Sequence, residues 1–431
     1  MSGESGKDLR QARRASGMPF GEFAKLAGFS EPYLRNVENG TRVLTLAVAQ
    51  AYDRVLSTGG VFAAVLGEPV AAARPWDRHG TLAMLTELAD GGGVDRRGFI
   101  VTSGAALAAL AGHWRAALDW QEPPADAEGT ATNMSAPALL DSVDVRLDHL
   151  RHMNDELGSN EMASLARNEL ALLVQMIKNG GLNDPMTDRA YSLACEASRQ
   201  VGWNLFDAGH HAAAQWYFGT ALRASAAAKD PVTGAYAMSL MAVQHYTAGE
   251  PKDAVKLLES AQDAVARKAT PRMKAMLAAR KARAISKTGD QRASVRALGE
   301  ARHWWEQGTC DDDAPQLYWV TAAEIEMIAG SSALQLNDPA WALHSFQAAI
   351  DSEQTGDVQF LPRWHAIYLT RAAEAHLGLH DLDAAVETGR RAAKCLGSVD
   401  SARSLKELTE LRTRLEPHRG HRAVREFLEV G

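Results

Sequence analysis

The apolar residues at the start of the chain recur at helical spacing, and they predict four short helices over residues 7–16, 20–27, 31–38 and 44–56. A glycine closely follows each of the first three segments. Glycine tolerates the left-handed backbone that ends many helices. The pattern therefore predicts a small bundle of short helices joined by tight turns.

The third of these segments carries its polar residues on one side. Leu34 and Val37 face the bundle at helical spacing, whereas Tyr33, Arg35 and Asn36 are expected to point outward. The hydroxyl of Ser30 is expected to cap the helix, and Pro32 stands in the first turn, where proline is tolerated. Two short helices across a small-residue turn, the second with a polar outer face, are the geometry that enters a major groove.

The segment carries a motif that can be compared with a known family. The residues concerned are Leu9-Arg10, Phe23-Ala24, Gly28-Phe29-Ser30 and Tyr33-Leu34-Arg35-Asn36-Val37-Glu38-Asn39-Gly40. They resemble the phage-repressor-like helix-turn-helix family, often called the Xre family. The resemblance implies that the third helix reads bases and that the start of the second helix contacts phosphate. One departure is that Phe20 follows Pro19 where the family usually has Gln. That contact is then missing, or Phe20 has become a packing residue.

Carried over position by position, the resemblance implies a set of DNA-binding residues: Arg14, Ser30, Glu31, Tyr33, Arg35, Asn36 and Arg42. Among them, Arg14 and Arg42 are the phosphate candidates. Arg35 and Asn36 are side chains suited to the edges of guanine and adenine. A domain of this kind usually reads two half-sites, so a homodimer on double-stranded DNA is expected.

From Ala136 onward the pattern is helical and repeats. Five turns align, at Gly209-His210, Gly249-Glu250, Gly289-Asp290, Asn337-Asp338 and His380-Asp381. A small residue stands four positions after each turn, and an alanine stands seven positions after that. These small residues are Ala214, Ala254, Ser294, Ala342 and Ala385, then Ala221, Ala261, Ala301, Ala349 and Ala392. Small residues at heptad distance after a turn predict closely stacked helical hairpins.

The other helix of each hairpin is expected over residues 233–247, 271–287, 315–328 and 362–377. A proline lies near each start, where it fits best. The array over about residues 140–415 resembles tetratricopeptide repeats, although its period is longer than that family's. The predicted fold is therefore all-α: an N-terminal helix-turn-helix bundle followed by a tetratricopeptide-like α-solenoid. Such an array forms a concave groove for a peptide, a small molecule or a protein.

The first helix of each hairpin usually faces the groove, and earlier amides could bind a peptide backbone. The candidate ligand-binding residues are Asn168, Gln175, Asn204, Tyr236, Gln244, His245, Lys274, Arg280, Arg283, Tyr318, Trp319, Arg363, Trp364 and Tyr368. Arg280 and Arg283 lie one helical turn apart, so both cations could meet one carboxylate. Packing or a solvated basic face is the competing interpretation for each of these residues.

Between the two parts lies a connector with two expected helices, over 78–89 and 96–119. In the second, Asp95 is the expected cap, and Gly104, Ala108 and Gly112 would let a partner helix approach, within the chain or from a second subunit. Arg96-Arg97 imitates a twin-arginine export signal but lies far inside the chain. The predicted division is 1–67, helix-turn-helix domain; 68–120, connector; 121–136, linker; and 137–431, repeat domain.

Composition excludes several functions. Residues 1–67 hold eight Lys and Arg against six Asp and Glu, whereas the 431-residue chain carries a net charge of −7. A mildly basic N-terminal domain in an otherwise acidic chain favours specific duplex binding. The three cysteines show neither disulfide nor metal spacing and fit a reducing cytoplasm. We see no membrane span, phosphate-binding loop or catalytic motif. Neither a cofactor nor an enzymatic activity is expected.

These patterns predict a cytoplasmic, sequence-specific DNA-binding transcriptional regulator. Its repeat domain would bind a peptide, small-molecule or protein signal that modulates DNA binding. Two alternatives stay open at this point. One is a repeat scaffold for protein partners that keeps a vestigial head, and the other is an exported ligand-binding protein.

Overall fold

The structure is a computed structural model that describes residues 2–42, 44–56, 58, 62, 74–90, 104–119, 136–157, 159–354, 362–396 and 401–429. These residues form helices and no β-strand, so the all-α prediction is confirmed. They divide into two compact units. The first comprises residues 1–140, 167–202 and 210–260, and the second comprises residues 141–166, 203–209 and 261–431. The division of the chain into four parts stays a prediction.

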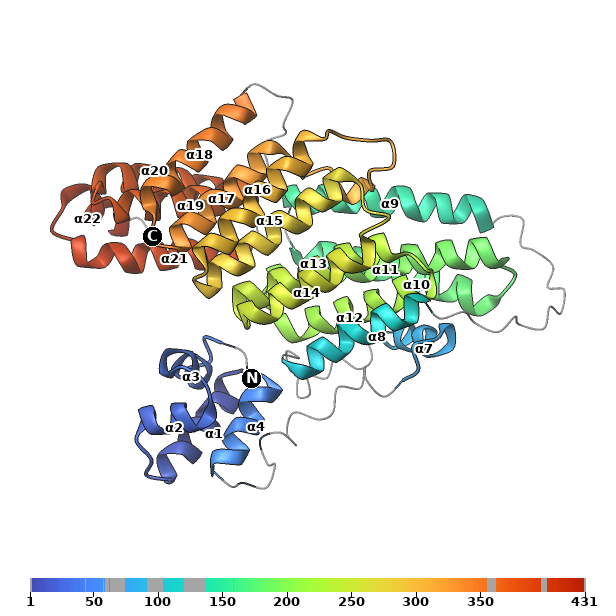
Figure 1. Ribbon diagram of the computed structural model, residues 1–431, viewed down its shortest axis with the longest axis horizontal. Helices are drawn as coiled ribbons and strands as arrows, with labels where there is room; N and C mark the ends of the chain where they lie inside the picture. The colour runs from blue at the N-terminus through green and yellow to red at the C-terminus, as the bar shows by residue number, and fades with distance from the viewer. Residues whose placement is uncertain are drawn as a thin grey trace. The chain divides into compact units, whose positions relative to one another are not determined.

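The N-terminal bundle of the first unit contains four helices: α1 (Ser2–Ala15), α2 (Phe20–Ala27), α3 (Glu31–Glu38) and α4 (Leu46–Leu56) (Figure 1). The predicted bounds of α2 and α3 are confirmed. The four helices enclose a small core in which Leu9, Phe23, Leu34 and Tyr52 are fully buried. The rings of Phe23 and Tyr52 meet edge to face at 4.6 Å. This core holds α2 and α3 at a fixed angle across their turn.

The connector contributes α7 (Arg78–Ala89) and α8 (Ala105–Asp119), both of which pack on α12. The bounds of α7 agree with the prediction. Trp114 on α8 is fully buried, and its Nε1 donates to Ser225 Oγ at 2.8 Å. Gly234 must be a glycine because a Cβ there would lie 2.6 Å from this indole. The indole therefore holds α8 against the body of the first unit.

The small-residue face predicted for α8 is not its contact face within the first unit. Ala108 and Gly112 are exposed, and a Cβ added at Gly112 would meet nothing within 4 Å. The packed face is instead formed by Leu107, Ala111, Trp114 and Ala117. The prediction that another helix of the same chain approaches at these small residues is therefore wrong for this unit. Asp95, Arg96-Arg97 and residues 121–135 of the predicted linker lie outside the described residues.

The remaining helices of the chain, in order, are α9 (Ala136–Leu157), α10 (Ser159–Asn179), α11 (Asp184–Asp207), α12 (His211–Ala227), α13 (Pro231–Ala248), α14 (Pro251–Val265), α15 (Pro271–Thr288), α16 (Gln291–Glu306), α17 (Ala322–Gln335), α18 (Pro339–Gln354), α19 (Pro362–Gly378), α20 (Leu382–Leu396), α21 (Ala402–Leu415) and α22 (Arg422–Glu429). Two 3₁₀ turns, η1 (Pro315–Leu317) and η2 (Glu416–His418), interrupt them.

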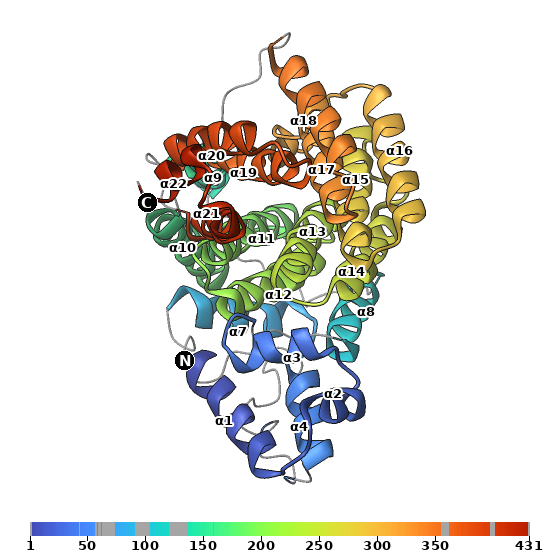
Figure 2. The ribbon, with the colours of Figure 1, turned by 90° about the vertical axis from the view of Figure 1, so that its left-hand side faces the viewer.

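Helical hairpins dominate the second unit. The pairs α15–α16, α17–α18 and α19–α20 each pack along their length, and α15, α17, α19 and α21 follow one another side by side (Figure 2). The predicted hairpin helix over residues 315–328 is wrong at its start. The chain forms η1 there, and α17 begins only at Ala322, where Thr321 Oγ1 accepts from the Glu324 amide at 3.1 Å. A capping hydroxyl fixes that start more strongly than the preceding proline does.

The repeat pattern itself is confirmed at its turns. Gly209, Gly289, Asn337 and His380 all have positive φ, between 62° and 86°. Gly249 alone among the five has a negative φ, −123°. All ten small residues that follow the turns are fully buried. Close stacking of the hairpin helices thus depends on side chains no larger than alanine or serine.

Candidate nucleic-acid interface

The turn between α2 and α3 sets the direction of the third helix. Gly28 takes the left-handed conformation at φ 80°, and its amide donates back to Ala24 and Lys25 carbonyls at 3.0 and 3.3 Å. Ser30 follows in extended conformation and begins α3. The predicted cap by the Ser30 hydroxyl is wrong. Pro32 at the second helical position lacks one of the two amides that such a hydroxyl normally bonds. The Ser30 side chain is exposed and makes no cap.

Two of the predicted reading residues lie on the outer face of α3. Leu34 and Val37 are buried, whereas Arg35 and Asn36 are exposed. The Asn36 carbonyl accepts from Thr41 Oγ1 at 2.9 Å, and Arg14 on α1 is also exposed. The face that these residues form has the polar chemistry of a base-reading helix.

Phe20 holds the guanidinium of Arg35. The Arg35 Cζ lies 4.7 Å above the centroid of the Phe20 ring, and the Cζ of Arg13 lies 4.2 Å from the same centroid. Glu31 pairs with Arg35 across one helical turn at 3.4 Å. Phe20 is also packed against the core of the bundle. Of the two readings offered for the residue that replaces Gln, the packing residue is the one that the structure supports.

A buried carboxylate ties α3 to its neighbours. Glu38 Oε1 and Oε2 accept from Arg13 Nε and Nη2 at 2.7 and 2.8 Å, and Oε1 also accepts from the Tyr52 hydroxyl at 2.8 Å. The hydrogen bond to Glu38 raises the pKa of Arg13, and burial together with Glu38 raises the pKa of Tyr52. Sequence reasoning missed this site. The available signal was an acidic residue that follows Val37 directly on the inward face of α3.

Tyr33 does not point outward, so that prediction is wrong. Its side chain is 8% exposed, because the ring stacks on Phe29 at 5.4 Å and lies beneath the Arg42 guanidinium at 4.8 Å. Burial raises the pKa of its hydroxyl, and the nearby Glu250 carboxylate raises it further. Arg42 is half-buried, and its Nη1 donates to the carbonyl of Gly249 at 3.2 Å. Tyr33 and Arg42 are therefore less exposed than Arg35 and Asn36.

Most candidates for the ligand groove are interior residues. Those that are at least nine-tenths buried are Asn204, Tyr236, Gln244, His245, Arg280, Arg283 and Tyr368. Asn168 and Gln175 are exposed, and Lys274, Tyr318 and Trp319 are half-buried. The side chains of Arg363 and Trp364 lie outside the described residues. Ligand binding by any of them stays a prediction.

Several of these buried groups have internal partners. Gln215 Nε2 lies 3.1 Å from His245 Nε2, Gln244 Nε2 donates to the carbonyl of His211, and the Tyr368 hydroxyl donates to Glu324. Burial lowers the pKa of His245 to about 4, so the imidazole is neutral near pH 7. These contacts are those of hydrogen-bonded core residues.

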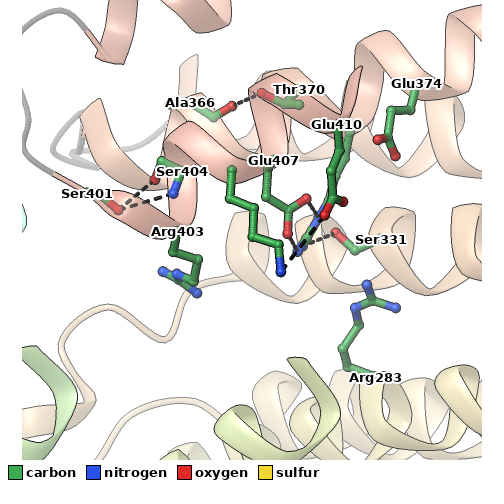
Figure 3. A network of polar contacts seen from close by, with 12 residues as sticks. Arg283, Ser331, Ala366, Thr370, Glu374, Ser401, Arg403, Ser404, Glu407 and Glu410 are labelled. Atoms are coloured by element: carbon green, nitrogen blue, oxygen red, sulfur yellow. Dashed lines mark hydrogen bonds and ion pairs between the residues drawn. The ribbon is translucent and has the colours of Figure 1, made fainter. Parts of the chain in front are cut away.

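Arg280 and Arg283 lie in two different environments. Arg280 stacks on Trp319, with its Cζ 4.8 Å from the ring centroid. Arg283 Nη1 donates to Ser286 Oγ at 3.1 Å and faces the carboxylate of Glu407 (Figure 3). Their joint binding of one carboxylate stays a prediction.

Glu407 belongs to a polar cluster of the second unit (Figure 3). Arg371 donates to its two oxygens at 3.1 and 3.4 Å and to Ser331 Oγ at 3.0 Å. Burial would raise the pKa of Glu407, but Arg371 and then Arg283 and Lys287 lower it to about 2. The carboxylate is therefore ionised and joins α17, α19 and α21.

The described residues contain no group of three or more His, Cys, Asp and Glu side chains that could hold a metal ion. Among the described helices, none is both long and apolar enough to span a bilayer.

Residues 6–65 match a family model described as a helix-turn-helix domain. The match covers most of α1 and all of α2, α3 and α4, the part of the chain that holds Arg35, Asn36 and the Glu38 site. The N-terminal bundle is thus a helix-turn-helix DNA-binding domain. A comparison with curated proteins gives no match.

Proposed function

We propose that this chain is a sequence-specific transcriptional regulator in which α3 reads the major groove of double-stranded DNA. One observation carries the proposal. Within a bundle that matches a helix-turn-helix domain, α3 buries Leu34 and Val37 and leaves Arg35 and Asn36 exposed. Arginine and asparagine are the side chains that bond guanine and adenine in a bidentate manner. Arg14 and Ser30, both exposed, are the proposed phosphate and backbone contacts.

The proposal includes the finer features of the Xre resemblance: a homodimer that reads two half-sites in the cytoplasm, and a tetratricopeptide-like array that binds a signal. The array is supported by the ten buried small residues at the repeat positions. A signal that binds one state of the dimer better than another would change DNA affinity by about 5–150-fold. The sedimentation of the full chain, alone and with a duplex of two half-sites, tests the dimer.

The decisive experiment starts from a pool of random duplexes. The full-length protein selects its preferred sequence, and the Kd is then measured at several salt concentrations. Steep weakening with salt and preference over a scrambled duplex are expected, because phosphate contacts release counterions while base contacts specify. Equal retention of the scrambled duplex, or none of either, favours the scaffold alternative.

Arg35→Ala and Asn36→Ala should each reduce discrimination by about 1–3 kcal/mol at one base pair. Gln50→Ala, which removes an exposed amide from α4, is the matched control and should leave the Kd unchanged. Circular dichroism of each variant checks that the bundle remains folded. If preference for the selected sequence survives both substitutions, α3 is not the reading helix.

A further inference from the structure

The α13–α14 turn of the first unit contacts two residues that are predicted to bind DNA. Arg42 Nη1 donates to the Gly249 carbonyl at 3.2 Å, and the Glu250 carboxylate neighbours both the Arg42 guanidinium and the Tyr33 hydroxyl. The Arg42 guanidinium also lies over the Tyr33 ring at 4.8 Å. The four residues thus form one connected contact, which we name the turn contact.

This turn differs from the others of the repeat. At the equivalent positions Asp290, Asp338 and Asp381 cap the following helix, each accepting from a backbone amide at 2.9–3.0 Å. Glu250 does not cap α14 in this way, and its carboxylate instead neighbours Tyr33 and Arg42. Gly249 also lacks the left-handed backbone of the other four turns. The turn before α12 also lacks a side-chain cap, at His210. The backbone of Gly249 is therefore what sets the α13–α14 turn apart, and its carbonyl is the group that accepts from Arg42.

The chemistry of the contact opposes DNA binding. A phosphate needs the positive charge and the donors of Arg42, but one donor is occupied by Gly249, and the Glu250 carboxylate offsets the charge. Burial raises the pKa of Glu250, as expected for a carboxylate removed from water beside Tyr33. A duplex that lay along α3 at Tyr33 would meet this carboxylate, whose charge repels phosphate.

We propose that the α13–α14 turn is a built-in inhibitor that occupies Tyr33 and Arg42 and must leave before α3 engages DNA fully. This inference rests on the proposed function, because it assumes that the same face of α3 binds DNA. A signal that prefers the released state raises DNA affinity by its differential affinity for the two states.

The test compares Glu250→Ala with Glu259→Ala in the full-length chain. Both variants lose one negative charge from the same part of the chain, but Glu259 is exposed on α14. Glu250→Ala should tighten the Kd for the selected duplex about tenfold, within the roughly 5–150-fold range of coupled sites. Glu259→Ala should change it by less than about twofold, as surface substitutions usually do.

A second measurement reports on the contact without DNA. Hydroxyl-radical labelling of Tyr33, read by mass spectrometry, should increase in Glu250→Ala and stay unchanged in Glu259→Ala. In the unmodified chain, addition of the selected duplex should also speed hydrogen exchange at residues 250–256, because the turn is released.

The two proposals fail differently. If the unmodified chain selects a duplex and both variants bind it with the same Kd and the same Tyr33 labelling, the inhibitor is overturned while the regulator stands. If neither the unmodified chain nor Glu250→Ala retains any duplex in preference to a scrambled one, the regulator is overturned and the inhibitor with it.

Discussion

Polar residues have opposite roles on α3 and on α13, two helices of the first unit. On α3 a narrow buried stripe leaves Arg35 and Asn36 in solvent. On α13 the buried residues run without a break from Gly234 to His245, so Gln244 and His245 lie inside the protein with partners there. A short helix at the surface exposes its polar side chains for a partner, whereas a helix surrounded by others uses them as internal hydrogen-bonding groups.

The largest effect is expected from removal of the charged residue that α3 buries, Glu38. Glu38→Ala leaves Arg13, whose side chain is 11% exposed, without its carboxylate. Breaking a buried pair in this way costs about 3–5 kcal/mol. Hydrogen exchange at the α3 amides should therefore speed strongly. Glu22→Ala, which removes an exposed carboxylate from α2, serves as the control. Equal exchange in the two variants would show that Glu38 does not hold α3.

The internal character of α13 can be tested by pH. His245 has an ordinary pKa near 6.5 when unfolded and about 4 when folded. Between these values the unfolded chain binds more protons, so acidification through this window destabilises the fold by up to about 3 kcal/mol. His245→Gln should flatten the dependence of unfolding free energy on pH between about 4 and 6.5, measured by urea titration. His79→Gln, at an exposed site on α7, should retain it. An unchanged slope in His245→Gln would contradict a buried neutral imidazole.

The smallest expected effect concerns the position of Arg35 on α3. Phe20→Ala removes the ring beneath Arg35. A cation–π contact at an exposed site contributes about 0.5–1 kcal/mol, so the Kd for the selected duplex should weaken about two- to fivefold. Leu26→Ala, at a side chain 53% exposed on the same helix, is the control for loss of apolar surface. No difference between the two variants would show that Phe20 does not position Arg35.

Much of the fold could be predicted because its signals are local. The bounds of α2, α3 and α7 follow from periodicity and breakers, and the ten buried small residues follow from the repeat of the turns. The predicted start of α17 is wrong because Pro315 begins a 3₁₀ turn, whereas Thr321 caps the α-helix.

The site was only partly predictable because its contacts are distant in sequence. Arg35 and Asn36 could be placed on the outer face from α3 alone. The ring of Tyr33 is covered by Arg42, and the hydrogen bond of Arg42 reaches Gly249, which is 207 residues away. The chemistry of the first helices suggests the candidate groove residues, but helical periodicity does not distinguish a side chain that meets a ligand from one that packs between helices.

The buried alanines between the hairpin helices have a mechanical consequence. Alanine has no side-chain rotamer. A helix contact formed by Ala301, Ala349 or Ala392 therefore contains no side chain that can change rotamer when a helix moves. A displacement of one hairpin in the second unit is then passed to its neighbour with little loss. A small movement of one hairpin is therefore expected to move the next hairpin as well.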